Sequence, residues 1–188
     1  MGMTAADILK TAEAAMLKAV SHLNDQFRGV SAGRASPAMV ENIKFDYYGT
    51  PTPLKGAAQI ATPDAATITI RPFDMSQVRA IAKAILEANI GLTPTDDGKQ
   101  VICRLPMMTT ENRQKLAKQC KDFAEAAKLP IKNARHEALK HGEASQKDST
   151  LTEDTHTKLK TDVQKLTDKY NKQLEDALKK KTEEVLKA

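Results

Sequence analysis

The stretch GRASPAMVENIKFDYYGTPTPL, residues 33–54, interrupts a chain whose other long segments have helical patterns. It combines a Gly-Arg pair, an Ala-Ser-Pro segment, a run of alternating residues and two prolines that are one residue apart. Between residues 40 and 48, Ile43, Phe45 and Tyr47 alternate with other side chains, and this period of two predicts a β-strand with one apolar face. The Gly-Thr-Pro-Thr-Pro sequence that follows predicts that the strand ends there.

The segment up to residue 106 continues this mixed α and β character. We expect strands over 58–62 and 67–71, which a Pro63-Asp64 turn separates. A short helix over 76–89 follows, with Asp74 or Ser76 as its cap. Gly91 is expected to close this helix, Asp97-Gly98 to make a turn, and residues 99–105 to form the last strand before Pro106.

Long amphipathic helices are predicted on both sides of this segment. Apolar residues step by three and four over residues 4–32, and Gly33 is the expected stop. The pattern returns from Thr109, where Pro130 predicts a kink or local break and Gly142 predicts the end of the helix. Its apolar seam consists of Leu116, Cys120, Phe123, Ala127, Ile131, Ala134 and Ala138. Residues 143–150 are expected to be a polar turn, and Thr152 caps the last helix.

Three long helices that are each apolar on one side can bury those sides together only as a bundle. Because the β-rich segment lies between the first helix and the second, it is best interpreted as an insertion. The sequence therefore predicts an elongated α+β protein, in which residues 1–30 and 106–188 form a discontinuous three-helix bundle. Residues 31–105 form an inserted β/α/β domain, with hinges near 30–34 and 105–106.

Composition agrees with a soluble globular protein that has an aliphatic core. Hydrophobic residues make up 40% of the chain and charged residues 28%, while aromatic residues are only 4% and tryptophan is absent. No apolar run approaches the length of a membrane span, and the N-terminus lacks the layout of a signal peptide. Neither Cys103 nor Cys120 belongs to a CxxC pair, so two buried thiols in a reducing cytoplasm are expected.

The excess positive charge is concentrated in one helix. The net charge is +5, and residues 113–140 alone carry eight Lys or Arg against three Asp or Glu. At about 100° per residue, that helix places four further cations within an arc of about 100° beside Lys118: Lys121, Lys128, Lys132 and Arg135. Such an arc suits the phosphates of a nucleic acid. A solvated lysine-rich face would produce the same pattern.

We find no pattern of an enzyme, and we expect neither a cofactor nor a metal. There is no glycine-rich phosphate loop and no HExxH motif. The four histidines lack metal-ligand spacing and are expected at the surface: His22, His136, His141 and His156. Two alternatives remain open, a coiled-coil adaptor that binds only proteins and a nucleotide-dependent enzyme in the central domain. The second needs a glycine loop, whereas the glycines here are isolated.

Five stretches give the chain a family resemblance: GRASPAMVENIKFDYYGTPTPL, AKAILEANIGLTPTDDGKQV, TTENRQKLAK, IKNARHEA and DVQKLTDKY. They resemble the ribosome recycling factor family, are collinear with it, and lie within a match from about residue 8 to residue 186. The resemblance implies an L-shaped protein without a catalytic centre that binds the bacterial ribosome after termination. With elongation factor G and GTP, such factors split the subunits and release the mRNA and the deacylated tRNA. It also implies contact with large-subunit rRNA, a cytoplasmic location and a monomer.

The resemblance also implies which residues bind rRNA and where this chain departs from the family. Arg135 matches a family arginine, and Arg113 matches the first of a pair. Lys132 and His136 stand where the family has arginines, and Gln114 replaces the second arginine of the pair. Ser31-Ala32 stands where the family usually has Arg-Thr, so this chain offers fewer cationic contacts. We expect rRNA contacts from Arg113, Lys121, Lys128, Lys132 and Arg135. The expected hinge consists of Val30, Ser31, Gly33, Arg34, Leu105 and Pro106.

Overall fold

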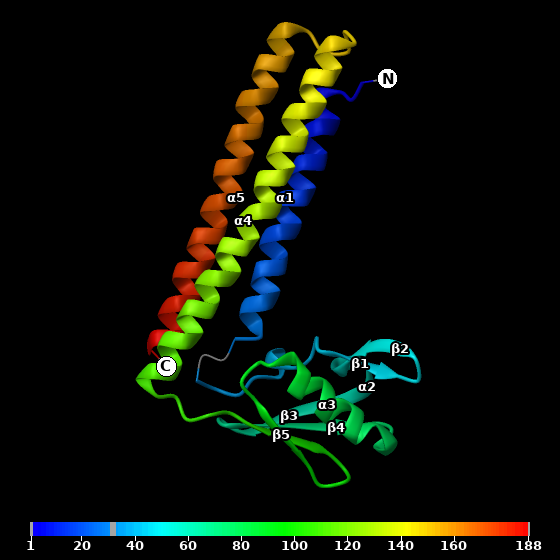
Figure 1. Cartoon of the computed structure of the whole chain (residues 1–188), viewed down its shortest axis with the longest axis vertical. Helices are drawn as coiled ribbons and strands as arrows, with labels where there is room; N and C mark the ends of the chain where they lie inside the picture. The colour runs from blue at the N-terminus through cyan, green and yellow to red at the C-terminus, as the bar shows by residue number, and fades with distance from the viewer. Residues whose placement is uncertain (1, 31–32, 188) are drawn as a thin grey trace. The chain divides into compact units, whose positions relative to one another are not determined.

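The computed structural model describes residues 2–30 and 33–187 and confirms the α+β class (Figure 1). The chain divides into two compact units. One, here called the bundle unit, consists of Met1–Phe27 and Lys118–Thr182. The other, the α/β unit, consists of Arg28–Ala117 and Glu183–Ala188.

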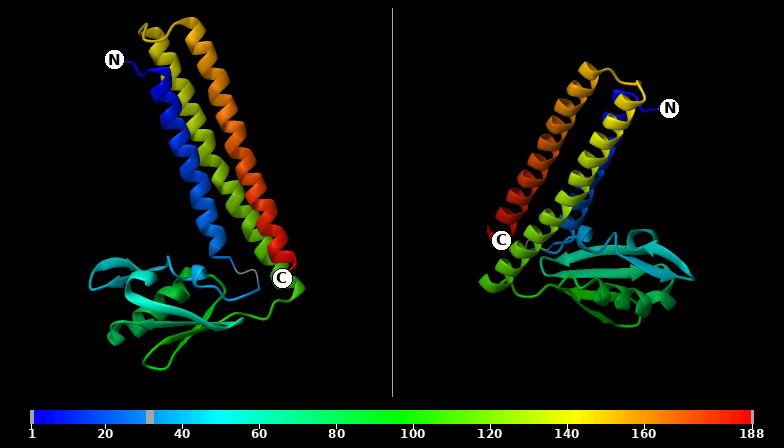
Figure 2. Two further views of the ribbon diagram at one scale, coloured as in Figure 1. Left: turned by 180° about the vertical axis from the view of Figure 1, so that it is seen from behind. Right: turned by 45° about the horizontal axis from the view of Figure 1, so that its top comes forward.

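Long helices α1 (Ala5–Arg28), α4 (Thr110–Lys147) and α5 (Glu153–Lys187) lie side by side in both views of Figure 2. Their predicted seams are largely buried, and the most enclosed side chains include Met16, Leu23, Ile131, Val163 and Leu174. On α4 the seam is less regular than predicted, because Leu116 and Phe123 are only half-buried. Burial of these one-sided apolar faces is what holds the helices together.

The ends of the helices differ from the prediction in two places. Helix α1 ends at Arg28 rather than near residue 32, because Gly29 follows and glycine is a poor helix former. Helix α4 does not end at Gly142 but continues to Lys147, so most of the predicted polar turn is helical. The loop before α5 is correspondingly short, at residues 148–152. The cap of α5 is confirmed, since the Thr155 amide donates to Thr152 Oγ1 at 3.2 Å.

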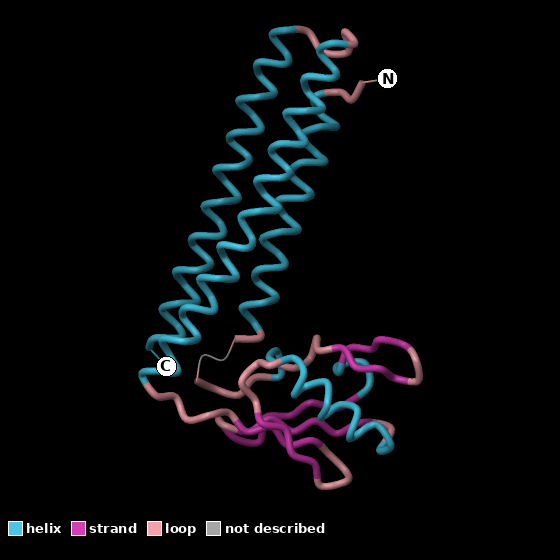
Figure 3. The backbone as a smooth tube through the Cα atoms, in the orientation of Figure 1, coloured by secondary structure: helices cyan, strands magenta, loops and turns pink. Residues whose placement is uncertain are grey.

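Gly142 has a packing role instead. A Cβ atom at this position would lie 2.9 Å from Leu159 Cδ2 and 3.3 Å from His156 Cδ2, both on α5. A glycine therefore allows α4 and α5 to approach closely, which periodicity within a single helix does not reveal. The local break predicted at Pro130 is also wrong, since α4 is helical on both sides of it. Figure 3 shows α4 as one continuous helix.

The α/β unit contains a hairpin and a sheet. Strands β1 (Lys44–Tyr47) and β2 (Thr50–Pro53) form the hairpin, with Tyr47 opposite Thr50. In the part of the chain that the structure describes, a four-stranded antiparallel sheet has the order β3-β4-β6-β5. Its strands are β3 (Ala58–Asp64), β4 (Thr67–Pro72), β5 (Thr93–Asp96) and β6 (Val101–Arg104). The remaining elements are α2 (Leu54–Ala57), α3 (Val78–Ala88) and the 3₁₀ turns η1 (Pro37–Met39) and η2 (Met75–Gln77).

One face of the sheet packs against α3. Ile68, Ile70, Val101 and Cys103 join Val78, Ile81 and Ile85 of α3 in one buried cluster. The alternation predicted for β1 is confirmed, since Phe45 is buried and its neighbours Lys44 and Asp46 are exposed. The core of this unit is therefore small and aliphatic, with Phe45 as its buried aromatic side chain.

Several predictions for the α/β unit need correction. The first strand begins at Lys44, because Ser36 caps η1 and Val40 lies in the turn after it. The Gly-Thr-Pro-Thr-Pro sequence does not end the strand pairing: it supplies β2, whose only partner strand within the described residues is β1, and prolines are tolerated on such an edge. Strand β5 was missed because its sequence, TPTD, lacks an apolar alternation. Helix α3 closes at Asn89, which adopts φ 50°, and not at Gly91.

The hinge positions remain a prediction. Ser31 lies outside the described residues. Val30 is buried, Gly33 has φ 91°, and Arg34 and Pro106 are exposed. The Leu105 amide donates to the Ala66 carbonyl at 2.8 Å, which attaches this end of the segment to the sheet.

Candidate nucleic-acid interface

A groove between α4 and α5 in the bundle unit collects most of the predicted cations. It has a volume of about 410 Å³, and Lys128, Lys132 and Arg135 all line it. Glu125 and Leu129 of α4 and Thr167 and Asn171 of α5 complete the lining. Helix geometry explains the clustering, because residues four and seven positions apart lie on the same helix face.

The three cations of this cationic groove are held differently. Lys132 is exposed, whereas Lys128 and Arg135 are half-buried. Lys128 Nζ lies 3.1 Å from Glu125 Oε1, a contact that partly offsets its charge. Arg135 Nε donates to Gln164 Oε1 at 3.0 Å, and Gln164 in turn donates to Asp168 Oδ1 at 2.9 Å.

The contact with Gln164 fixes the direction of the Arg135 side chain across the two helices. The hydrogen bond to Gln164 uses Nε of Arg135. The terminal nitrogens of this guanidinium donate no hydrogen bond among the described residues. Those nitrogens form the planar fork that binds two phosphate oxygens at once. The contact with Gln164 therefore leaves the terminal nitrogens of Arg135 without a protein hydrogen bond in the described part of the chain.

The other two predicted residues lie apart from the cationic groove. Lys121 is exposed two helical turns before Lys128 on the same face of α4, but it does not line the groove. Arg113 belongs to the α/β unit, where its Nη1 donates to the Leu186 carbonyl of α5 at 3.3 Å. Its Nε is buried without a partner in the described part of the chain. In this structure, therefore, Arg113 caps the C-terminal end of α5, where carbonyl groups lack helical donors.

Sequence reasoning missed the α5 side of the groove. Thr167 is buried and donates to the Val163 carbonyl at 2.9 Å, and Asn171 Oδ1 is buried without a partner among the described residues. The signal was present, because Gln164, Thr167, Asp168 and Asn171 recur at helical spacing on one face of α5. That polar stripe could not be matched to α4 before the packing of the two helices was known.

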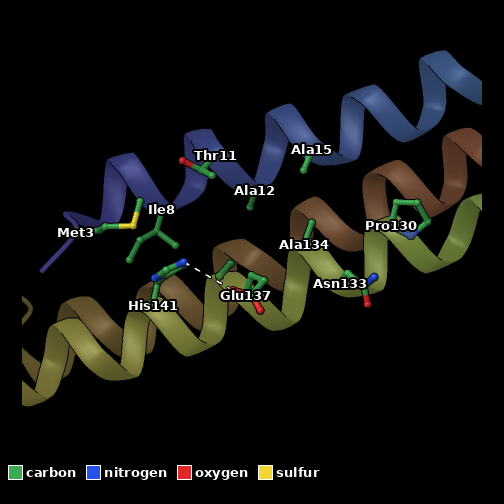
Figure 4. Close-up of a pocket in the computed structure, with 11 residues that line it drawn as sticks. Met3, Ile8, Thr11, Ala12, Ala15, Pro130, Asn133, Ala134, Glu137 and His141 are labelled. Carbon is green, nitrogen blue, oxygen red and sulfur yellow. Dashed lines mark ion pairs between the residues drawn. The ribbon is translucent and has the colours of Figure 1, made fainter.

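A second groove, between α1 and α4, has a different character (Figure 4). Its volume is about 460 Å³, and small side chains such as Ala12, Ala15 and Ala134 line much of it, with Pro130 toward one end. Its ion pair joins Glu137 Oε2 and His141 Nε2 at 3.9 Å, a pair that requires a protonated histidine. No lysine or arginine lines this groove. It does not have the charge that a phosphate site needs.

One of the four histidines does not lie at the surface as predicted. His22, His136 and His141 are exposed as expected, but His156 is 5% exposed and its Nε2 has no partner within the described residues. It is buried where Gly142 lets α5 approach α4, which the sequence could not show. The buried state of both cysteines is confirmed, and burial raises the pKa of each thiol, that of Cys103 to about 11. Both thiols are therefore poor nucleophiles.

The described residues contain neither a cluster of metal-ligating side chains nor a helix that could span a membrane. Residues 2–30 and 33–187 contain no cluster of three or more metal-ligating side chains. None of the helices in these ranges is both long and apolar enough for a bilayer crossing.

The fold and the site define an α+β protein in which a bundle of long helices has a cationic groove and a second unit is built around a sheet. The sequence profile of the family described as "Ribosome recycling factor" matches residues 23–186. The ribosome-recycling factor of Nitratiruptor sp. is 42% identical over 181 residues, covering 96% of this chain and 97% of its own length. The factor of Oleidesulfovibrio alaskensis is 41% identical over 179 residues, which cover 95% of this chain and 97% of its own length. This chain therefore belongs to the ribosome recycling factor family.

Some relatives are longer than this chain. The chloroplastic ribosome-recycling factor of Spinacia oleracea is 41% identical over 172 residues, covering 92% of this chain. The chain spans only 64% of the length of that relative, and 65% of the length of the two chloroplastic relatives from rice.

Solved structures give the same family. A solution structure of the ribosome recycling factor covers 100% of both chains with a TM-score of 0.74 and 34% identity. Another match is described as the T. thermophilus ribosome recycling factor and E. coli elongation factor G bound to the E. coli post-termination complex. It covers 98% of this chain and 100% of that chain, with a TM-score of 0.61 and 30% identity.

Proposed function

We propose that this protein is a ribosome recycling factor that binds the post-termination ribosome. With elongation factor G and GTP, it promotes splitting of the subunits and release of the mRNA and the deacylated tRNA. Membership of the family over nearly the whole chain is the observation that carries this proposal. The neighbour bound with elongation factor G to the post-termination complex supports the choice of partners.

The protein acts by binding and by mechanical displacement, and it has no catalytic centre. The proposal includes action in the cytoplasm as a monomer. The bacterial relatives match over nearly their whole length, which supports a bacterial-type factor.

Large-subunit rRNA binds along the exposed face of α4. Lys128, Lys132 and Arg135 form the centre of this contact, because they share the cationic groove, and Lys121 extends it along the same face. Arg113 was assigned to the same contact from the resemblance. Its bond to the Leu186 carbonyl supports a structural role beside any RNA contact.

The two units have different parts in the mechanism. The bundle unit acts as a stiff wedge, because its helices bury one another along their length. The inserted domain, residues 31–105, acts as a lever that elongation factor G moves, with the hinge near 30–34 and 105–106. A lever needs separate bodies, and the chain does divide into two compact units, but their boundaries fall at residues 27–28, 117–118 and 182–183 rather than at both ends of the proposed lever.

The decisive experiment is a subunit-splitting assay with purified ribosomes, elongation factor G and GTP. We expect splitting that depends on all three components. A chemical cross-link between the units should abolish splitting while ribosome binding persists, and splitting that survives the cross-link would refute the lever. An adaptor that binds only proteins would give neither splitting nor salt-sensitive binding to large subunits.

A further inference from the structure

Arg135 differs from Lys128 in the group that holds it within the cationic groove. Arg135 Nε donates to the amide oxygen of Gln164 at 3.0 Å, whereas Lys128 Nζ lies 3.1 Å from a carboxylate oxygen of Glu125. None of the ion pairs found among the described residues involves Arg135. A carboxylate offsets the charge of a cation beside it, and a neutral amide does not. Arg135 therefore keeps its full charge although its side chain is attached to α5.

Asp168 decides which end of the Gln164 amide faces Arg135. A glutamine amide has an oxygen that accepts and a nitrogen that donates, and rotation of the amide exchanges the two. Gln164 Nε2 donates to Asp168 Oδ1 at 2.9 Å, one helical turn further along α5. Because a carboxylate only accepts hydrogen bonds, this contact turns the Gln164 oxygen toward Arg135. We call these three side chains the arginine brace.

The arginine brace lies at the surface of the bundle unit. Gln164 and Asp168 are exposed, and Arg135 is half-buried. Exposed polar contacts contribute little to stability, because water competes for the same groups. An ordered arginine does matter to a ligand, because a ligand that must order a flexible side chain binds more weakly. The brace orders Arg135 before binding, in a groove that Lys132 also lines.

We propose that Gln164 and Asp168 are positioning residues for the rRNA contact. They hold Arg135 so that its two terminal nitrogens meet a phosphate group of large-subunit RNA, and they act only through Arg135. The neutral amide is needed between the guanidinium and the Asp168 carboxylate, because a carboxylate paired directly with Arg135 would offset the charge that attracts the phosphate. This inference deepens the proposed function and rests on it.

Removal of the amide tests the positioning. Gln164→Leu keeps the net charge and should weaken binding to isolated large subunits about threefold to tenfold, since the RNA must then order Arg135 itself. In an Arg135→Ala background the same substitution should have no effect. A loss of equal size in both backgrounds would overturn the inference, because Gln164 would then act without Arg135. Unchanged binding of Gln164→Leu would overturn it too.

Two substitutions of Asp168 separate its hydrogen bond from its charge. Asp168→Asn and Asp168→Leu remove the same negative charge, but only the asparagine variant can still accept a hydrogen bond from Gln164. We therefore expect Asp168→Leu to bind large subunits about threefold more weakly than Asp168→Asn in filter-binding titrations at one salt concentration. Equal binding by the two variants would refute the role of Asp168.

Gln164→Glu tests the need for a neutral partner. The new carboxylate would pair directly with Arg135, so binding to large subunits should fall about tenfold. Gln173→Glu is the matched control, because it makes the same change on α5 at a residue that does not line the cationic groove. Nine positions at about 100° per residue place it on the opposite face of the helix. Equal losses in the two variants would contradict the inference.

The arginine brace can also be measured without the ribosome. Nitrogen-15 relaxation of the arginine Nε–H groups in the full chain reports how well Arg135 is ordered. Gln164→Leu and Asp168→Leu should both lower this order, and unchanged order in both variants would refute the brace. A parent protein that binds no large subunits, although Arg135 is ordered, would refute the proposed function instead, and with it the RNA role of the brace.

Discussion

The cationic groove and the β1–β2 hairpin depend on different kinds of contact. Lys128, Lys132 and Arg135 share a face because one regular helix brings residues four and seven positions apart together. The hairpin turn at Tyr48 is instead tied to Asp74, 26 positions further along the chain, by one hydrogen bond. A charged helical stripe can be found by counting along the chain, whereas a contact between separate turns cannot.

The largest effect is expected from reversing a charge in the cationic groove. Arg135→Glu should weaken binding to isolated large subunits by about tenfold to a hundredfold, since a bidentate arginine contact contributes about 1–3 kcal/mol. Binding should also become less sensitive to salt. A filter-binding or cosedimentation titration at several salt concentrations measures both.

Lys10→Glu is the matched control, because it makes the same charge change on the exposed side of α1. It should leave binding close to that of the parent protein. Equal losses in Arg135→Glu and Lys10→Glu would show that net charge, and not the groove, governs binding.

A second prediction concerns the spacing of the helices that form the groove. Gly142→Ala should lower the free energy of unfolding by about 1–2 kcal/mol, because overpacking a tight contact outweighs the better helix propensity of alanine. The new Cβ would lie 2.9 Å from Leu159 Cδ2. Urea unfolding measures the change. In the control Gly56→Ala the nearest side-chain atom is 3.8 Å away, so no overpacking loss is expected. A more stable Gly142→Ala protein would contradict the packing role.

A third prediction concerns the bond between α1 and α5 in the bundle unit. The Tyr170 hydroxyl donates to Glu13 Oε1 at 2.8 Å, and Tyr170 is 3% exposed. Tyr170→Phe should therefore lower the free energy of unfolding by about 1 kcal/mol at neutral pH, the usual contribution of a buried hydrogen bond. Urea unfolding of both proteins at pH 7 measures this difference.

The same pair has a pH dependence of known sign. Burial, followed by the bond to Glu13 and its charge, raises the pKa of Tyr170 above the model-compound value of 10.0. The native state thus holds this proton more tightly than the unfolded state, so the stabilisation is fully present below pH 10 and is lost as the pH rises through the native pKa. The difference between the parent protein and Tyr170→Phe should shrink in that range. A difference that grows with pH would contradict this assignment.

The smallest effect is expected at the hydrogen bond between Tyr48 and Asp74. Tyr48→Phe removes a hydrogen bond to the Asp74 carboxylate and should move the pKa of Asp74 back toward its ordinary value of 3.8, although Ser76 still holds it lower. Carbon-13 NMR of the aspartate carboxyl groups in an acid titration measures the shift. Asp97 is the internal control, because its lowered pKa depends on the amides of Lys99 and Gln100 and should not change.

Much of the bundle unit could be predicted because its signals are local and repeated. The seam of α4 and the Thr152 cap depend on residues within one or two turns of each other. The wrong predictions concern residues whose structure depends on contact with another helix or strand. The sequence pattern predicts that Gly142 ends the helix. In the structure Gly142 instead lets Leu159 and His156 of α5 pack closely against α4. In the α/β unit, TPTD has no apolar alternation, and its pairing with β6 makes it a strand.

The amino-acid sequence by itself determined the family, the α+β class, the excess of cations on α4 and the aliphatic seams. Each of these depends only on which residues are present and how they are spaced along the chain. Only the tertiary structure decided which cations share a groove and that Arg113 caps α5. It also decided that His156 is buried and that Tyr48 meets Asp74. These facts depend on contacts between residues far apart in the chain, and such contacts arise only when helices pack and strands pair.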